Sequence, residues 1–403
     1  MTNEELSVDA LIEDIHNILD TPAPTNRRRF SQTPPPEAAP LKAAPQKAPR
    51  KRSPWRTFFG VIGRIFVVLL ETVLLAAVAL YGVMFVLAKG PSPTARELFV
   101  RSVQETSAAG FLANLFFTDE EIAQITANKG IPDYIQTDVS LIEITKPTEP
   151  DPTADGPQAD AWGLIDEDGD GIIIEEVKGE GYAGYMMVVL DPSRVILGSD
   201  PGNYNIRGYT VEQMVKKYDA VAGTNAGGFW DENGEGNGSI PDSMVVYEGK
   251  VYYSGKGSHN GFAGFDDQHI LHVGNFTSAD VKKRNIQYGV GFGPVLVVNG
   301  EIAYTGSLGS GVNPRTAIGQ RSDGAVLLLV IDGRQVTSMG ATFMDLAEVF
   351  LKFGAVNACN MDGGSSSMMW YDGDYVNNCA SMIGIRPVPT AFLVLKEGVN
   401  ADG

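Results

Sequence analysis

An apolar run between Ile65 and Leu87 constrains this chain more than any other stretch. It is almost uninterrupted hydrophobic sequence, and Glu71 is its one charged residue. As a helix, about 23 residues would be roughly 34 Å long, which is enough to cross the hydrocarbon core of a bilayer. The run lies too far from the N-terminus, and is too long, for a cleaved signal peptide. The sequence therefore predicts a transmembrane helix over residues 58–88, with a short segment before it and a large domain after it.

Charge on the two sides of this run predicts its orientation. The basic residues just before it are Lys42, Lys47, Arg50, Lys51, Arg52, Arg56 and Arg64, whereas Lys89 and Arg96 follow it. The positive-inside bias then places the N-terminus in the cytoplasm and the C-terminal domain outside the cell membrane. The presence of Glu71 in the apolar run has two possible explanations. It pairs with another membrane protein, or it is tolerated in its protonated form, since an acid at mid-membrane costs roughly 2.5–3.5 kcal/mol.

The segment before the run has two parts. Residues 1–20 place apolar side chains on one face of a short helix: Leu6, Leu11, Ile12, Ile15 and Leu19. This helix is either solvated or a docking helix for a cytoplasmic partner. Residues 21–57 are rich in Pro, Ala, Lys and Arg, cannot bury a core, and are predicted to form a disordered tether.

Residues 91–160 are predicted to form a helical stalk and a linker. Thr94 to Asn128 has a helical pattern with a break at Gly110, and Pro147 to Gly156 is rich in proline and aspartate. The stretch Asp166 to Gly171 then imitates the first half of a calcium-binding EF-hand loop. The twelfth position of such a loop needs a glutamate, but this chain has Val177, so an acidic turn before a strand is the better interpretation.

Residues 161–399 are predicted to form one α+β domain with a mixed β-sheet and strand-helix-strand units. Strand-like runs alternate with turns: Met186–Leu190, Val245–Tyr247, Val251–Tyr253 and Val295–Val298. The dipeptides Glu248-Gly249 and Asn299-Gly300 are typical of hairpin turns. About 240 residues are enough for one substantial core.

Two predicted strands of this domain each end in Asp-Gly. Ala325 to Ile331 is an aliphatic run suited to a strand buried on both faces, and it leads to Asp332. A helix is predicted over Ser338–Gly354, in which Thr342 and Asp345 come close to a capping box, and the next strand leads to Asp362. If these strands are parallel neighbours, a right-handed crossover puts both aspartates at one edge of the sheet. A third unit combines a capped helix over Thr210–Ala220 with a strand that ends at Asn225.

The octet Asn360 to Ser367 combines a carboxylate, two glycines and three hydroxyls. By itself it fits a simple turn after a strand as well as a binding loop. Two arginines favour the binding loop. Arg334 follows the first Asp-Gly, and Arg315 follows a proline that fixes the backbone. A guanidinium group is well suited to a phosphate diester. Because the net charge is −18, local arginines must hold an anionic substrate.

These residues resemble the phosphodiester glycosidase family. The matching blocks, in order, are Thr224–Phe229, Gly291–Pro294 with Val297–Gly300, Asn313–Gly319, Asp332–Gln335 and Asn360–Ser367. The resemblance covers roughly Gly181 to Val394. It implies hydrolysis of a sugar-1-phosphodiester, which releases the sugar from the phosphate.

The resemblance gives the candidate residues their roles. Arg315 and Arg334 would clamp the phosphate, and Asp362 and Asp332 would act as acid, base or nucleophile at the anomeric carbon. An aspartate after a buried strand also fits a second role, bracing an arginine, and for Asp332 both roles stay open. Residues expected to contact the sugar and phosphate are Asn225, Gly227, Thr316, Gly363, Gly364, Ser366 and Ser367. The predicted partners are a phosphodiester-linked glycan and the membrane; an envelope glycopolymer is expected from the topology.

Other chemistries fit the sequence less well. Gly364 to Met368 fails the serine-hydrolase elbow at its last position. His269 and His272, with Asp266 and Asp267, suggest a metal site, but a structural role is favoured, and no cofactor or metal is expected. No nucleic-acid module is found. Cys359 and Cys379 lie outside the membrane, where a disulfide and free thiols are both compatible with the sequence.

Two rival functions remain. One is a non-catalytic protein of the cell envelope that binds glycopolymers or serves as a scaffold. The other is a phosphodiesterase that breaks the P–O bond instead of the glycosidic bond. Intact Arg315, Asp332 and Asp362 favour an enzyme over a binder, because a binder could lose them.

Overall fold

The computed structural model describes residues 54–106, 109–127, 137–145, 156–204, 206–231, 236–254, 261–303, 310–381 and 384–399. The predictions for residues 1–20, for the tether up to residue 53 and for most of the linker after residue 146 lie outside these residues. The chain divides into two units, Met1–Leu70 and Glu71–Gly403.

The predicted apolar helix is present. Helix α2 spans Pro54–Lys89, and its stretch Phe58–Lys89 is long and apolar enough to cross a membrane. None of its most apolar 18-residue window is buried inside the protein, so that apolar surface is available to a bilayer. The helix is therefore confirmed, and its position in a membrane stays a prediction.

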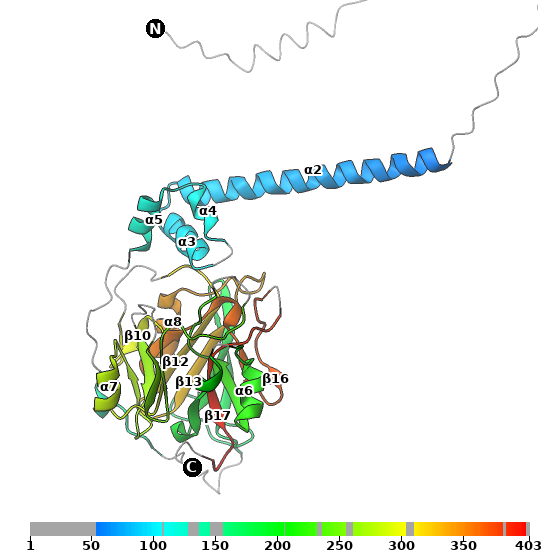
Figure 1. Cartoon of the computed structure of the whole chain (residues 1–403). Helices are drawn as coiled ribbons and strands as arrows, with labels where there is room; N and C mark the ends of the chain where they lie inside the picture. The colour runs from blue at the N-terminus through cyan, green and yellow to red at the C-terminus, as the bar shows by residue number, and fades with distance from the viewer. Residues whose placement is uncertain are drawn as a thin grey trace, which may run out of the picture. The chain divides into compact units, whose positions relative to one another are not determined.

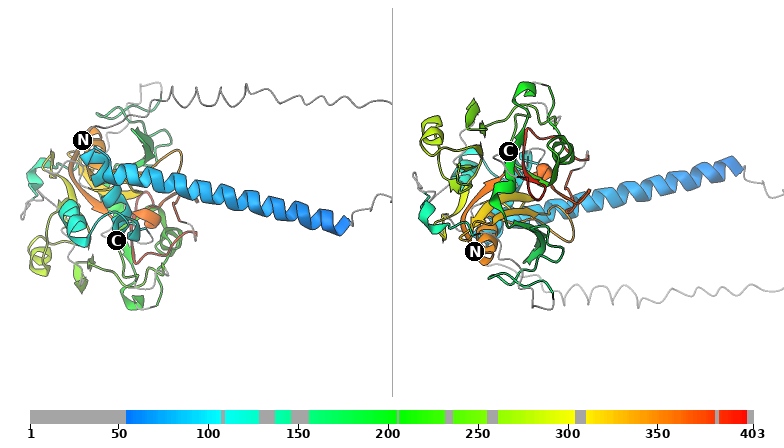
Figure 2. Two further views of the ribbon diagram at one scale, coloured as in Figure 1. Left: turned by 90° about the horizontal axis from the view of Figure 1, so that it is seen from above. Right: turned by 90° about the horizontal axis from the view of Figure 1, so that it is seen from below.

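Three short helices follow α2: α3 (Pro93–Gln104), α4 (Phe111–Asn114) and α5 (Asp119–Thr126). Figures 1 and 2 show them together at the C-terminal end of α2. They share a small apolar cluster: Ala88, Phe99, Val100, Ala113, Phe116, Phe117 and Ile122. Ser92 caps α3, whose first residue is a proline, and Thr118 and Glu121 form a capping box on α5. The predicted break near Gly110 is confirmed.

The remaining residues build three sheets (Figure 1). The first has seven strands in the order β1 (Ile172–Gly179), β2 (Tyr182–Val189), β13 (Val326–Ile331), β12 (Arg315–Arg321), β14 (Ala355–Met361), β10 (Val295–Val298) and β11 (Glu301–Ile302). The second has five: β16 (Asp374–Tyr375), β15 (Met369–Tyr371), β4 (Ala220–Asn225), β17 (Thr390–Leu395) and β3 (Val195–Ser199). The third also has five: β6 (Lys250–Ser254), β5 (Met244–Tyr247), β9 (Tyr288–Gly291), β7 (Phe262–Phe265) and β8 (Leu271–Val273).

Helices cover the outer faces of the sheets. The longer ones are α6 (Val211–Lys217), α7 (Ser278–Lys283) and α8 (Phe343–Lys352), and the 3-10 turns are η1 (Val139–Leu141), η2 (Pro192–Arg194), η3 (Pro201–Asn203) and η4 (Gly364–Ser366). Alternate residues of β13 point to opposite faces. Leu327, Leu329 and Ile331 pack with α8, whereas Val326, Leu328 and Val330 join a core shared with the other two sheets. The prediction of a strand buried on both faces is confirmed.

The sheet topology corrects one prediction. Every pairing between described strands is antiparallel, so the predicted mixed sheet is wrong. β13 and β14 are not neighbours, because β12 forms a hairpin with β13 and lies between them. Both strands are antiparallel to β12 and thus run in the same direction. For this reason Asp332 and Asp362 still follow strands that end at one edge of the first sheet.

Several local predictions are confirmed. Thr342 and Asp345 form a capping box on α8, as do Thr210 and Gln213 on α6. The hairpin turns have the positive φ expected of such dipeptides, for example 53° at Asn299. However, α8 begins at Phe343 and not at Ser338. The Ser338 hydroxyl instead donates to the Asp332 carbonyl oxygen at 2.6 Å, and Gly340 has a φ of 117°, which is incompatible with a helix.

Candidate active site

Asn225 joins the parts of the candidate site. It ends β4 in the second sheet and is fully buried. Its Nδ2 donates to the Asp362 carbonyl oxygen at 2.6 Å. Its Oδ1 accepts from the Thr316 hydroxyl at 2.8 Å and from the Met368 N–H at 3.0 Å. This one side chain therefore links β4, β12 and both ends of the loop after β14.

The loop after β14 needs its two glycines for different reasons. A Cβ on Gly363 would lie 2.7 Å from the Pro314 carbonyl oxygen, so only glycine allows this close approach. Gly364 has a φ of 63°, which glycine adopts most easily, and its N–H donates to the same Pro314 oxygen at 2.9 Å. The loop is thus held against the residues that precede Arg315.

The Asp362 carboxyl lies at the start of this loop and is half-buried. Its pKa is raised to about 7, mainly by burial and also by the negative charge of Asp242. A hydrogen bond from Ser366, the N–H of Gly363 and the charge of Arg386 oppose that rise. A carboxyl with this pKa can take up or release a proton at neutral pH, which general acid–base catalysis requires.

Asp242 was not predicted from the sequence. Its N–H donates to the Gly228 carbonyl oxygen at 3.1 Å, and a Cβ on Gly228 would lie 2.5 Å from its Oδ2. The Asp362 N–H donates to the Ala226 carbonyl oxygen at 2.9 Å. Both aspartates are therefore held by the short segment that follows β4. Since Asp242 belongs to no motif, only this backbone pairing could have indicated it.

Arg386 was missed for the same reason. Its charge acts on Asp362 and also lowers the pKa of Arg334. Its NH2 lies 3.8 Å from the Asp231 Oδ2, which is longer than a hydrogen bond. Its Nε is buried and has no hydrogen-bond partner among the described residues. Arg386 thus adds a positive charge that acts on Asp362, and its Nε donor is unused among the described residues.

Arg334 lies where the sequence placed it, near the octet. Its NH1 contacts the Ser365 hydroxyl at 3.4 Å, and its NH2 contacts the Asn313 Oδ1 at 3.3 Å and the Thr106 hydroxyl at 3.2 Å. Burial lowers the pKa of Arg334, and the charges of Arg315 and Arg386 lower it further. Three guanidinium groups that repel one another form a place where an anion is favourable.

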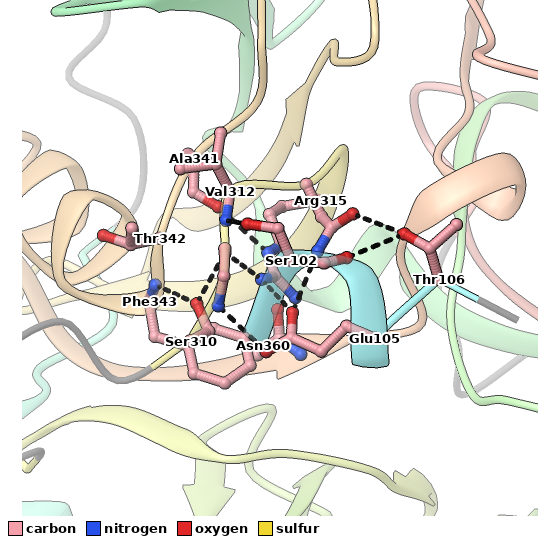
Figure 3. Close-up of polar contacts among 12 residues, drawn as sticks. Ser102, Glu105, Thr106, Ser310, Val312, Arg315, Ala341, Thr342, Phe343 and Asn360 are labelled. Atoms are coloured by element: carbon pink, nitrogen blue, oxygen red, sulfur yellow. Dashed lines mark hydrogen bonds and ion pairs between the residues drawn. The ribbon is translucent and has the colours of Figure 1, made fainter. Parts of the chain in front are cut away.

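Arg315 points into the loop that precedes it (Figure 3). Its Nε donates to the Ala341 carbonyl oxygen at 3.1 Å and its NH2 to the Gly311 carbonyl oxygen at 2.7 Å. The guanidinium lies over the Phe343 ring, 4.4 Å from its centroid. Its NH2 also forms an ion pair of 2.6 Å with Glu105, at the end of α3.

Asp332 has a different environment from Asp362. Its Oδ1 accepts from the Asn377 side chain and from the Asn378 N–H, each at 3.0 Å. Burial raises its pKa, and these hydrogen bonds oppose the rise. Its Oδ1 is thus directed toward residues 377–378. The arrangement is that of a brace for residues 377–378.

Two predicted substrate contacts are used inside the protein. The Gly227 N–H donates to the Thr390 hydroxyl at 3.0 Å, so it is directed toward β17. The Ser367 carbonyl oxygen accepts from Asn377 at 3.1 Å, while its hydroxyl is buried without a hydrogen-bond partner among the described residues. The structure thus brings together Asp362, Arg334, Asn225, Thr316, Gly363, Gly364 and Ser366.

Both cysteines are free thiols, which decides the question of a disulfide. Cys359 is fully buried in β14. The Cys379 thiol donates to the Ser365 carbonyl oxygen at 3.3 Å, and burial raises its pKa. Cys379 therefore packs against the octet without a covalent partner.

The groups considered as metal ligands have structural contacts. His272 and Asp266 pair at 2.7 Å between Nε2 and Oδ2, and Asp266 also accepts from the N–H groups of Gln268 and Ile270. In the acidic turn, the carboxylates of Asp166, Asp168 and Asp170 lie within 4.8 Å of one another. These aspartates accept from backbone N–H groups of the turn, and β1 begins at Ile172 as predicted.

Comparison with known proteins finds a family whose model matches the segment that contains these residues. Residues 218–395 match the model of the phosphodiester glycosidase family. The chain is 34% identical over 189 residues to the SPbeta prophage-derived uncharacterized protein YomE of Bacillus subtilis, over 45% of this chain and 29% of that protein. It is 28% identical over 222 residues to human N-acetylglucosamine-1-phosphodiester alpha-N-acetylglucosaminidase, over 50% of this chain and 42% of that protein.

A solved structure with some similarity is the catalytic domain of the zebrafish N-acetylglucosamine-1-phosphodiester alpha-N-acetylglucosaminidase, auto-inhibited by its pro-peptide. The match has a TM-score of 0.46 and 19% identity, and covers 56% of this chain and 82% of that one. The chain thus spans less than half the length of the curated relatives it matches. The segment that contains Asp242, Arg315, Arg334, Asp362 and Arg386, residues 218–395, is thus similar to the phosphodiester glycosidase family.

Proposed function

We propose that this chain is a membrane-anchored, extracytoplasmic hydrolase that cleaves the glycosidic bond of a sugar-1-phosphodiester. The family match supports this proposal, as do the names of the relatives that act on N-acetylglucosamine-1-phosphodiesters. The observation that carries it is the half-buried Asp362 carboxyl, which has a pKa of about 7 and on which the positive charge of Arg386 acts.

The arginines act on the leaving group. When the bond between the anomeric carbon and the phosphate oxygen breaks, the electron pair goes to that oxygen, and negative charge grows on the phosphate. Arg334 and Arg315, with Arg386 beside them, would stabilise this charge in a site with little water. Phosphate leaves readily as an anion, so the leaving oxygen needs no proton from an acid.

Asp362 acts on the nucleophile. In its ionised form it would take a proton from a water molecule whose oxygen bonds to the anomeric carbon. Asp242 is the second carboxylate and would stabilise the positive charge that develops on the sugar ring. Gly363, Gly364 and Ser366 surround Asp362 and are the proposed contacts of the substrate. Asn225, Thr316 and Asp332 would act by holding the loops in place.

The predicted membrane topology of the chain indicates the compartment in which its substrate occurs. With α2 in the bilayer and the basic residues on the cytoplasmic side, the domain faces the cell envelope. A glycopolymer joined through a sugar-1-phosphate is a substrate of the right chemistry in that compartment. Its phosphate is the group that the arginines would hold.

The test is turnover by the full-length chain in detergent on a panel of sugar-1-phosphodiesters in oxygen-18 water. Cleavage of the glycosidic bond puts the label on the released sugar. Label on the phosphate would mean that the P–O bond breaks, and the proposal would be wrong. Binding of the panel without any turnover would favour a glycopolymer-binding protein instead.

A further inference from the structure

The residue at the end of α3, Glu105, contacts Arg315, one of the two arginines of the predicted phosphate clamp. Glu105, the residue after α3, receives three donors from one loop: the Gly311 N–H at 2.9 Å, the Asn313 Nδ2 at 3.0 Å and the Arg315 NH2 at 2.6 Å (Figure 3). Two N–H donors and a guanidinium that converge on one carboxylate form a cradle for an oxyanion. The carboxylate of Glu105 thus lies where an anionic substrate group would be held.

Neighbouring residues of α3 extend this contact. The Val312 N–H donates to the Ser102 hydroxyl at 2.8 Å. The Thr106 hydroxyl contacts the Asn313 Oδ1 at 3.2 Å and accepts from the Arg334 NH2 at 3.2 Å. Ser102, Glu105 and Thr106, here called the α3 end, therefore reach both arginines of the predicted phosphate clamp.

We propose that the α3 end is a gate on the phosphate site. This rests on the proposed function, because the group that Glu105 excludes is the substrate phosphate. The carboxylate neutralises Arg315 and fills its cradle, so phosphate binds only when the α3 end withdraws.

The contacts of Arg315 favour a gate over a positioning role for Glu105. The carbonyl oxygens of Ala341 and Gly311 already fix the guanidinium, which also packs on the Phe343 ring. Arg315 would keep its orientation without Glu105. The Glu105 side chain is 31% exposed, and an ion pair with that much solvent is weak enough for a competing anion to displace. Glu105 nevertheless competes effectively with phosphate because it belongs to the same chain as Arg315. Such an intramolecular ligand acts at an effective concentration of roughly millimolar or above.

The first test removes the competing charge. In the full-length chain in detergent, we expect Glu105→Gln to bind inorganic phosphate at least about tenfold more tightly by titration calorimetry. We expect KM for a sugar-1-phosphate methyl ester to fall by a similar factor with kcat unchanged, because only competition for binding is removed. Glu120→Gln, which removes an exposed carboxylate from α5, is the matched control and should behave as the unaltered chain.

The second test opens the gate with Glu105 intact. A Cβ on Gly311 would lie 2.2 Å from the Ser102 nitrogen, so Gly311→Ala should keep the α3 end from docking and should also tighten phosphate binding. If Glu105→Gln lowers kcat and leaves phosphate binding unchanged, Glu105 is a positioning residue and the gate is wrong. The gate is also wrong if the tighter binding survives in a Glu105→Gln, Arg315→Ala double variant, because the anion then binds elsewhere.

These outcomes separate the gate from the proposed function. Tighter phosphate binding by both variants, with no turnover of any sugar phosphodiester, would support the gate and reject the enzyme. Turnover with equal KM and equal phosphate affinity in all variants would support the enzyme and reject the gate.

Discussion

At the residue scale, Asp362 combines two properties that oppose each other. Its burial gives it a pKa of about 7, which suits proton transfer at neutral pH. The same burial makes its ionised form costly to the fold. Asn225 and Gly363 hold the loop that keeps the carboxyl in this position. The chain therefore gives up stability in order to keep a carboxyl with a useful pKa.

We expect Asp362→Asn to stabilise the protein at alkaline pH. In the folded chain Asp362 keeps its proton up to about pH 7, whereas in the unfolded chain it loses it near pH 4. The folded state thus binds more protons between these values, and its stability falls as pH rises through that window. Asparagine does not titrate, so the gain should be on the order of a few kcal/mol at pH 8 and should vanish near pH 4.

Melting curves of both proteins at a series of pH values test this expectation. A gap in melting temperature that does not change with pH would show that the folded-state pKa of Asp362 is not raised. In the same samples, turnover by Asp362→Asn should be lost by about a hundredfold or more.

Activity should follow the ionisation of the same group. As the proposed base, Asp362 must be ionised, so kcat/KM should rise with pH and level off above about pH 7. Below pH 6 it should fall about tenfold for each pH unit. A pH–rate profile of the full-length chain checks this. A profile that rises as pH falls below 6 would assign Asp362 the role of an acid instead.

At the element scale, the sequence predicted what lies on single elements and failed where elements are joined by long loops. The capping boxes on α6 and α8, the hairpin turns and the buried strand β13 follow from local patterns, and all are present. The neighbours of β13 do not follow, because the hairpin with β12 decides the sheet order. Arg334 and Asp362 were found through motifs that follow strands. Asp242 and Arg386 reach the site from loops, so no local pattern indicates them.

The packing of the loop after β14 against Pro314 can be tested at Gly363, which allows the two to lie close together. We expect Gly363→Ala to lower both turnover and stability, because its Cβ would be 2.7 Å from the Pro314 carbonyl oxygen and the loop would have to move by a few tenths of an ångström or more. A loss of about 1–3 kcal/mol is typical of such overpacking. Chemical denaturation measures it, with Gly202→Ala as control, since the nearest atom to a Cβ there is 3.9 Å away. Equal losses in both variants would contradict the expectation.

At the scale of the whole molecule, the apolar helix α2 is joined to α3 by a short connection. Gly90, Pro91 and Ser92 separate α2 from α3, and Ala88 of α2 belongs to the same apolar cluster as α3 and α5. The Tyr81 ring lies 5.5 Å from that of Phe116. The C-terminal end of α2 therefore packs with the short helices that follow it.

We expect the full-length chain to stay with membranes after carbonate extraction, and deletion of residues 58–88 to release it. In intact cells, an added protease should reach a tag at the C-terminus and not one at the N-terminus, because the basic residues before α2 favour the cytoplasm. Immunoblots of both tags read the result. Protection of the C-terminal tag would reverse the predicted orientation.

The junction at Asn225 has a consequence for how the protein ages and fails. One amide side chain joins β4 of the second sheet to β12 and to the loop after β14. Deamidation would replace a donor with an anion opposite the Asp362 carbonyl oxygen, in a fully buried position. A single spontaneous chemical change there would break the link between β4, β12 and the loop after β14 while most of the hydrophobic interior stays packed.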